Sequence, residues 1–182
     1  MTGIIVQARQ GSKRLQKKSL MKFHGEPLLA RVARLLRPVG EKIIVATSTN
    51  KEDDSIEHWC TKHKVSCFRG DADDVLRRFY NCASVYKLDV IIRITADCPF
   101  ISSDLIELCL HQFLRDGGKG YVGFHGLRGL NVEVFDFGTL QQAFLHGPDE
   151  HVTTWMRKQE WAKSLEELEI NTKDDFKRLS RL

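Results

Sequence analysis

The chain has 182 residues, of which 42% are hydrophobic and 29% are charged, and its formal net charge is +4. This length predicts a single domain, residues 1–182, that can bury a core of ordinary size. The sequence holds no apolar run near the ~18–20 residues that cross a bilayer, and it begins without a charged-then-apolar leader. Its five cysteines are scattered without a CxxC pair, which favours reduced thiols. We therefore expect a cytoplasmic protein without membrane insertion.

The charges are unevenly distributed along the chain. Residues 1–42 hold ten Lys and Arg residues against two Glu, and a single aromatic residue, Phe23, so this part carries +8 and the remainder −4. A local excess of this kind favours one anion-binding site. A nucleic-acid surface is typically marked by basic residues interleaved with aromatic ones, so we expect no nucleic-acid partner.

Strand patterns and helix patterns alternate along the chain. In chain order they predict a strand at 3–8, a helix from Pro27 to Leu36, a strand at 42–47, a helix at 52–63, a strand at 65–68, a helix at 72–87, a strand at 89–95 and a helix at 102–114. Asp104 and Glu107 form a capping pattern at the start of the last of these helices. The alternation predicts a three-layer α/β/α sandwich with a mainly parallel, Rossmann-like sheet.

Polar residues follow each predicted strand. The strand ends are Ala8-Arg9, Thr47-Ser48, Arg69-Gly70 and Ala96-Asp97. Because the carboxyl ends of parallel strands meet at one edge, where ligands of open α/β sheets bind, we expect these residues to lie together. A basic glycine-containing loop, two hydroxyls, an arginine and an aspartate are the components of a site for a metal and a nucleotide.

The loop after the first strand is built to hold a polyanion. Gly11 lets the backbone approach a phosphate, Ser12 can donate a hydrogen bond, and Arg9, Arg14 and Lys18 supply positive charge. The loop lacks the GxxxxGK[ST] spacing of a Walker motif. The alternative interpretation is a basic, solvated surface loop.

Asp97 follows an apolar strand, where a carboxylate can bind Mg²⁺ together with substrate phosphate oxygens. The alternative is an aspartate that caps the turn before the next helix.

Several other polar residues favour structural roles. Arg31, Arg34 and Arg37 lie opposite an apolar helical stripe, which predicts a solvated face. Histidines and cysteines between residues 58 and 67 match no zinc spacing, and Cys98 is expected to be a buried thiol. Trp155 and Trp161 are expected in packing or dimer contacts, and residues 163–182 in a helix packed by one face.

Six segments in chain order resemble one family. ARQGSKRLQKKSL (residues 8–20) is similar to the ARxGSxRLPGKxL signature of the cytidylyltransferases that activate acidic sugars, which include the acylneuraminate and 3-deoxy-manno-octulosonate enzymes. The other matching segments are VATSTNKEDDSI (45–56), FRGDADDVLRRFY (68–80), RITADCPFI (93–101), GLNVEVF (129–135) and DEHVT (149–153). The chain most resembles the spore-coat-polysaccharide branch.

The resemblance implies a nucleotide-diphospho-sugar transferase type of fold and an Mg²⁺-dependent reaction. CMP would pass from CTP to an acidic sugar with release of pyrophosphate, for surface polysaccharide biosynthesis. By position, the implied catalytic residues are Arg9, Lys18 and Asp97, of which Asp97 would hold Mg²⁺. The implied nucleotide-binding residues are Ala8, Arg9, Gly11, Ser12, Arg14, Lys18, Thr47, Ser48 and Arg69. Glu133 and His151 would lie on the sugar side, and Asp74 and Arg78 match the motif without an assigned role.

The sequence departs from the family pattern in three places. Gln16-Lys17 replaces the usual Pro-Gly of the loop, and Asn171 stands where the family carries a late aspartate that serves as a second metal ligand. The segment 148–182, which in relatives shapes the sugar pocket and often a dimer interface, is shortened. These departures keep a second hypothesis open, a homologue that binds a nucleotide or nucleotide sugar with weakened catalysis. A homodimer also stays open.

Overall fold

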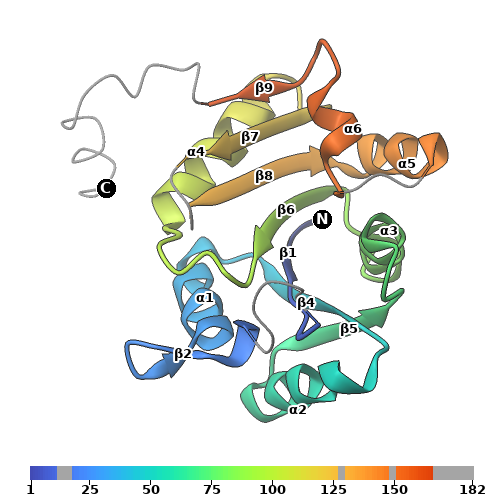
Figure 1. Cartoon of the computed structure of the whole chain (residues 1–182). Helices are drawn as coiled ribbons and strands as arrows, with labels where there is room; N and C mark the ends of the chain where they lie inside the picture. Colours follow the sequence, from blue (N-terminus) through green and yellow to red (C-terminus); the bar gives the residue numbers. More distant parts are fainter. Residues whose placement is uncertain (12–17, 127–129, 148–150, 166–182) are drawn as a thin grey trace.

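The computed structural model describes residues 1–11, 18–126, 130–147 and 151–165, and it is built around a seven-stranded sheet. The strand order is β5-β4-β1-β6-β8-β7-β9, and Figure 1 shows this order running from the lower to the upper part of the molecule. A separate two-stranded hairpin, β2 (Lys22–Phe23) and β3 (Glu26–Pro27), precedes the first helix.

The first half of the sheet is parallel, as predicted. It consists of β5 (Ser66–Gly70), β4 (Lys42–Ser48), β1 (Thr2–Gln7) and β6 (Val90–Thr95). Side chains of β1 alternate between two cores, since Ile4 and Val6 face one core and Ile5 faces the other. All three are fully buried, which explains why this strand reads as a continuous apolar run.

The second half of the sheet is mostly antiparallel and was not predicted. β8 (Asn131–Asp136) pairs antiparallel with β6 and with β7 (Tyr121–His125), and β9 (Lys163–Ser164) pairs parallel with β7. β9 replaces the start of the helix predicted for 163–182, and residues 166–182 lie outside the described part of the chain.

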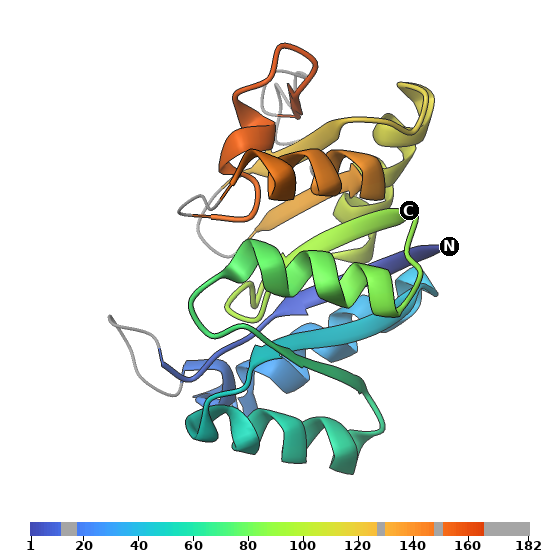
Figure 2. The same cartoon turned by 90° about the vertical axis from the view of Figure 1, so that its right-hand side faces the viewer.

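Helices cover both faces of the sheet and complete the predicted three layers. One face packs against α1 (Leu28–Leu36), α2 (Asp54–His63) and α4 (Ser103–Arg115). The other packs against α3 (Val75–Val85), α5 (Phe137–His146) and α6 (Thr154–Arg157). Figure 2 shows α3 and α5 side by side across this second face. Short 3₁₀ turns lie at η1 (Lys18–Leu20), η2 (Arg37–Val39) and η3 (Lys51–Asp53).

The helix boundaries follow their caps. Asp74 caps α3 by accepting a hydrogen bond from the Arg77 amide at 2.8 Å, so the helix begins later than predicted. The predicted capping pattern for α4 is wrong in its residues, because Ser102 provides the cap by accepting from the Leu105 amide at 3.3 Å. Within the described residues, none of the helices combines the length and the apolar character that crossing a membrane requires.

Candidate functional site

The predicted strand ends meet at one edge of the sheet. The Ala8 amide donates to the Ala46 carbonyl at 3.1 Å, and the Ala96 amide donates to the Gln7 carbonyl at 2.9 Å. These bonds continue the parallel pairing of β1 with β4 and β6 beyond the last strand residues. The backbone at Ala8 is therefore flanked by the ends of both neighbouring strands, as the sequence predicted.

A buried aspartate that the sequence analysis missed fastens this edge. Asp53 is 1% exposed and accepts hydrogen bonds from the Gln10 amide at 2.6 Å, the Ser48 amide at 3.0 Å and the Ser48 hydroxyl at 2.5 Å. It thereby joins the loop after β1 to the end of β4. From sequence, its place before α2 resembles that of an ordinary helix-start residue, so spacing carries no signal of this role.

The basic loop is anchored on both sides of residues 12–17. On one side Gly11 lies against η3, where an added Cβ would clash with the carboxylate of Glu52. On the other side the Ser19 hydroxyl donates to the Arg9 carbonyl at 3.2 Å. Two predicted phosphate ligands, Ser12 and Arg14, lie outside the described residues, and their roles stay predictions.

The two hydroxyls and the arginine that were predicted to bind the nucleotide, Thr47, Ser48 and Arg69, differ in how far the protein already uses them. Thr47 is fully buried and its Oγ1 has no hydrogen-bond partner, whereas the Ser48 hydroxyl is used by Asp53. Arg69 donates from Nε to the Ser48 carbonyl at 3.0 Å and from Nη2 to the Asn50 carbonyl at 2.9 Å. Its Nη1 contacts carboxylates of α2, Glu57 at 2.7 Å and Asp54 at 2.6 Å. Arg69 therefore ties β4, β5 and α2 together.

The structure brings two predicted catalytic residues together. Lys18 Nζ donates to Asp97 Oδ2 at 2.7 Å, and the Thr95 hydroxyl donates to Asp97 Oδ1 at 2.6 Å. Burial acts to raise the pKa of Asp97, but the hydrogen bonds from Lys18 and Thr95 outweigh it and hold that pKa below its usual value. Asp97 thus remains a carboxylate, and both side chains of the ion pair are partly exposed to a ligand.

The donor set fits a metal that is shared with a substrate. Among the described residues, no group of three or more His, Cys, Asp or Glu side chains could enclose a metal ion. Mg²⁺ commonly binds one or two carboxylates and completes its shell with water and substrate phosphates. Asp97 suits this arrangement, and its role as the Mg²⁺ ligand stays a prediction.

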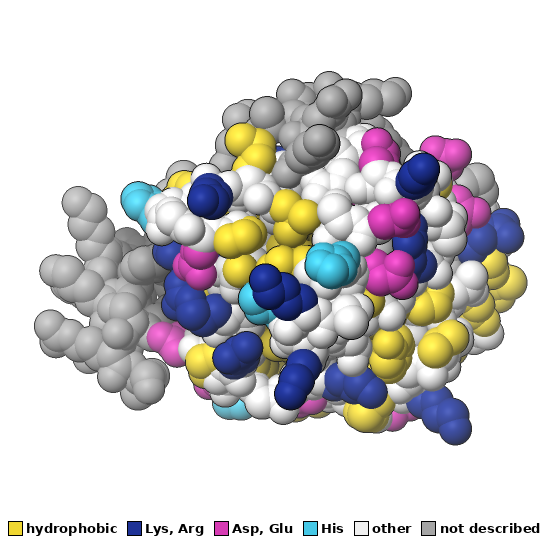
Figure 3. Space-filling model, turned by 90° about the horizontal axis from the view of Figure 1, so that it is seen from below, with side chains coloured by type: hydrophobic (Ala, Val, Ile, Leu, Met, Phe, Trp, Pro, Cys, Tyr) yellow, Lys and Arg dark blue, Asp and Glu magenta, His cyan; other side chains and the backbone are white. Residues whose placement is uncertain are grey.

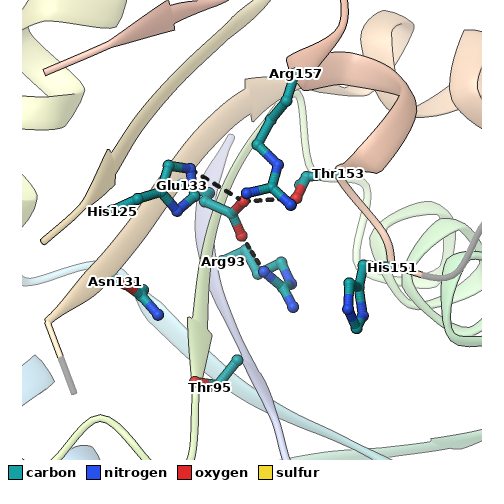
Figure 4. A pocket seen from close by; sticks show the side chains of 8 residues that line it. All are labelled: Arg93, Thr95, His125, Asn131, Glu133, His151, Thr153 and Arg157. Carbon is teal, nitrogen blue, oxygen red and sulfur yellow. Dashed lines mark hydrogen bonds and ion pairs between the residues drawn. The ribbon is translucent and has the colours of Figure 1, made fainter. Parts of the chain in front are cut away.

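A pocket opens beside this pair, on the α6 side of the sheet (Figure 4). Thr95, which holds Asp97, also lines the pocket, so the two features are continuous. Figure 4 shows the side chains that point into it from β6, β7, β8 and the segment around α6. The lining residues are Arg93, Thr95, His125, Asn131, Glu133, His151, Thr153 and Arg157.

Glu133 is the centre of the polar network in the pocket wall. It forms an ion pair with Arg93, its register partner on β6, and accepts from the hydroxyls of Tyr121 at 2.9 Å and Thr153 at 2.6 Å. His125 Nε2 lies 3.7 Å from Glu133 Oε1. Burial acts to raise the pKa of Glu133, but the Arg93 charge, together with the contacts from Thr153, His125 and Tyr121, holds that pKa below its usual value. The network fixes the pocket wall.

Arg93 joins the pocket to the strand edge. Its Nε and Nη2 donate to Gln7 Oε1 at 3.2 and 2.8 Å, so one arginine links β1, β6 and β8. Glu133 and His151 were predicted on the sugar side, whereas six further lining residues were not predicted: Arg93, Thr95, His125, Asn131, Thr153 and Arg157. An arginine inside a β-branched run, as in DVIIRIT, was the available signal for Arg93.

Unsatisfied polar atoms gather at the strand edge. In the part of the chain that the structure describes, the buried side-chain atoms without a hydrogen-bond partner are Gln10 Oε1, Thr47 Oγ1, Arg78 Nε and Arg78 Nη2. Gln10 follows β1, Thr47 lies near the end of β4, and Arg78 packs against Gly70 at the end of β5. Buried polar groups normally find partners, so this clustering favours a ligand here.

The remaining sequence predictions have mixed outcomes. Arg31 does not simply face solvent, because its Nε donates to the Pro99 carbonyl at 2.7 Å and ties α1 to the turn after Asp97. Cys98 is buried, with its sulfur 3.1 Å from the Thr95 hydroxyl oxygen. The Trp155 and Trp161 rings pack edge to face with centroids 6.1 Å apart.

Basic side chains are mixed with other types on the face that Figure 3 shows. Acidic, hydrophobic and uncharged groups lie between the Lys and Arg side chains in that view. The absence of a nucleic-acid partner stays a prediction.

Comparisons with known proteins identify the family. Residues 3–146 match the family model described as cytidylyltransferase. An uncharacterised protein of Methanocaldococcus jannaschii is 38% identical over 84% of this chain and 65% of its own length. The spore coat polysaccharide biosynthesis protein SpsF of Bacillus subtilis is 28% identical over 98% of this chain and 84% of its own. A 3-deoxy-manno-octulosonate cytidylyltransferase of Chlorobium limicola is 32% identical over 62% of this chain and 46% of its own.

Solved structures agree with this assignment. A cytidylyltransferase from Leptospira borgpetersenii superposes with a TM-score of 0.82 at 29% identity, covering 90% of this chain and 74% of that one. A CMP:2-keto-3-deoxy-manno-octonic acid synthetase, solved with CTP, shares the fold with a TM-score of 0.67 at 14% identity, covering 86% and 82%. The chain spans less than two thirds of the length of the Methanocaldococcus and Chlorobium proteins.

Proposed function

Because the chain belongs to the cytidylyltransferase family, we propose that it transfers CMP from CTP to an acidic sugar and releases pyrophosphate. The observation that carries the proposal is the Lys18–Asp97 pair, which joins the end of the basic loop to the turn after β6. Thr95 links this pair to the pocket, since it holds Asp97 and lines the pocket. A nucleotide on the loop side and an acceptor in the pocket would therefore meet at Asp97.

The chemistry asks for positioning and charge neutralisation. A sugar hydroxyl attacks the α-phosphorus of CTP in line, and the bond to the bridging oxygen of pyrophosphate breaks. Mg²⁺ held by Asp97 and the phosphates would neutralise charge on the triphosphate. Lys18 would stabilise the negative charge that develops on the leaving pyrophosphate, and Arg9 would hold the triphosphate at the end of β1.

The pocket supports an anionic acceptor. The charge of Glu133 is already matched by Arg93, and Arg157 brings a further positive charge to the same lining. Glu133 is 2% exposed and hydrogen-bonded, so it serves to hold its neighbours while the charge of Arg157 remains to attract a carboxylate. The name of the Chlorobium relative, which is specified for an acidic sugar, supports the same class of acceptor, and that of SpsF supports a role in polysaccharide biosynthesis.

The test is pyrophosphate release from CTP and Mg²⁺ with a panel of 2-keto sugar acids. We expect release that depends on both Mg²⁺ and one panel member, with a matching CMP-sugar product. Tight CTP binding with no pyrophosphate release for any acid of the panel would favour the second hypothesis, a binding homologue with weakened catalysis. Asn171 is the residue that motivates this hypothesis.

The matched variant for this second hypothesis is Asn171→Asp, which restores the family's carboxylate. A gain in Mg²⁺-dependent release in this variant alone would identify the native chain as a weakened enzyme.

A further inference from the structure

Arg78 is the largest fully buried side chain of the molecule's described part, and the proposed reaction has not used it. It lies on the first turn of α3, and its Cγ would be 2.9 Å from a Cβ added at Gly70. The glycine at the end of β5 therefore lets the arginine pass closely beneath the strand edge.

The guanidinium of Arg78 is only partly satisfied. Its Nη1 donates to the Asp71 carbonyl at 2.5 Å, whereas Nε and Nη2 have no partner. Burial lowers the pKa of Arg78, and the charge of Arg9 lowers it further, against the opposing effect of Asp53 and other carboxylates. A buried cation with idle donors is costly, and a bound acceptor would relieve that cost.

The two idle nitrogens form one edge of the planar guanidinium. Their N–H bonds point in the same direction, so this edge suits two adjacent acceptor atoms. The N3 and O2 atoms of cytosine are such a pair. Uracil carries an N–H at position 3, so this donor would face an N–H donor of Arg78 and no hydrogen bond could form there. Arginine reads guanine in DNA by the same principle, through the adjacent O6 and N7 acceptors.

We propose that the Nε–Nη2 edge of Arg78 recognises the N3–O2 edge of cytosine and so selects CTP over UTP. The inference rests on the proposed function, since it names how the same site chooses its nucleotide.

The position of Arg78 favours the base over the phosphates. It lies at the end of β5, whereas the Lys18–Asp97 pair lies at the end of β6, three strands away in the order β5-β4-β1-β6. With neighbouring strands about 4.8 Å apart, the two strand ends are separated by roughly 14 Å, a span on the scale of a nucleoside triphosphate. The phosphates at Lys18 would place the base toward β4 and β5.

Arg69, which also lies near the end of β5, cannot offer the same edge. Each guanidinium nitrogen of Arg69 already donates to a carbonyl or a carboxylate. Thr47, on the neighbouring β4, adds an unpartnered hydroxyl oxygen to the region. The idle edge of Arg78 is closed to solvent, so binding must displace part of its cover.

The test compares nucleotide binding by the full chain and by Arg78→Met, which removes the donors and keeps the length. Dissociation constants are measured for CTP, UTP and tripolyphosphate with Mg²⁺. We expect the wild type to prefer CTP over UTP by on the order of 10- to 100-fold, the scale of a bidentate base contact. In Arg78→Met this ratio should collapse toward one, while UTP and tripolyphosphate bind as before.

A base analogue and two further variants sharpen the test. The triphosphate of pyrimidin-2-one riboside keeps N3 and O2 but lacks the 4-amino group, so Arg78→Met should weaken it by the same factor as CTP. Arg78→Lys keeps the charge without the fork and should also lose the CTP preference. Arg77→Met, on the exposed side of the same turn, should retain it.

Three outcomes would overturn the inference. Equal weakening of CTP, UTP and tripolyphosphate would make Arg78 a phosphate ligand, and an unchanged CTP/UTP ratio in a folded Arg78→Met or Arg78→Lys would make it structural. A wild type that binds CTP and UTP equally would also refute it.

Turnover is a separate readout. Selective CTP binding without sugar transfer would refute the proposed function alone, and transfer that continues with unchanged selectivity in Arg78→Lys would refute this inference alone.

Discussion

The two halves of the sheet treat their polar groups in opposite ways. In the parallel half, the strand edge leaves Thr47 and Arg78 with buried atoms that have no partner, and its Lys18–Asp97 pair is partly exposed. In the antiparallel half, Glu133 is buried and its neighbours Arg93, Tyr121 and Thr153 saturate it. The comparison favours a ligand site at the edge of the parallel half, whereas the antiparallel half supplies a fixed pocket wall.

The largest expected effect is on catalysis at the edge of the parallel half. Asp97→Ala removes the carboxylate proposed to hold Mg²⁺, and we expect pyrophosphate release to fall by on the order of 100- to 1,000-fold. The thermal midpoint should change little, since the pair is partly exposed and such pairs add little to stability. Mg²⁺-dependent activity retained in Asp97→Ala would refute the ligand assignment.

A substitution in the antiparallel half should mainly change the stability of the fold. Glu133→Ala leaves the largely buried side chain of Arg93 without its ion-pair partner and frees the Tyr121 and Thr153 hydroxyls, and we expect a loss of about 3–5 kcal/mol in the free energy of unfolding. Denaturant titration measures this loss. Glu133→Gln, which keeps hydrogen-bonding capacity, serves as the matched control and should lose less. A loss in Glu133→Ala below about 1 kcal/mol would contradict the network.

A smaller effect on stability is expected for Asp53, the buried carboxylate that accepts hydrogen bonds at the edge of the parallel half. Asp53→Ala leaves the Gln10 and Ser48 amides without their acceptor, which should cost roughly 2–4 kcal/mol of stability. Because Asp53 anchors the loop after β1, CTP affinity should fall as well, as isothermal titration would detect. Asp53→Asn keeps one acceptor oxygen and should be intermediate. Unchanged CTP affinity in a folded Asp53→Ala would separate the loop from the nucleotide.

The smallest effect is a difference in acid sensitivity. The folded pKa of Glu133 is held below its unfolded value, near 4.3, since Arg93 and the hydrogen bonds from Thr153 and Tyr121, with the nearby His125, together outweigh burial. Its stabilisation is therefore complete above about pH 4.3 and is lost as the pH falls through the lower folded pKa. Below about pH 4.5 the wild type should lose stability more steeply than Glu133→Gln, as paired denaturant titrations would show. Parallel pH profiles would contradict the assignment.

The parallel half was predictable because its rules are local. Apolar runs such as Ile4–Val6 and the helical stripes between them specify strands, helices and a parallel sheet, and parallel strands bring Ala8 and Ala96 to one edge. The antiparallel half was not, because β7 and β8 follow each other closely after the regular alternation of strand and helix has ended. Without β8, the register that sets Glu133 opposite Arg93 cannot be foreseen.

The sequence by itself determined the order of the parallel elements, the family and the edge at which its polar residues gather. Only the tertiary structure decided which of these polar groups are hydrogen-bonded within the protein and which keep donors or acceptors for a ligand. Arg69 and Arg78 look alike in the sequence, yet one is bonded at every nitrogen and the other keeps an idle edge. The physical reason is that a hydrogen bond depends on partners from distant segments, whose placement is set by packing and not by local spacing.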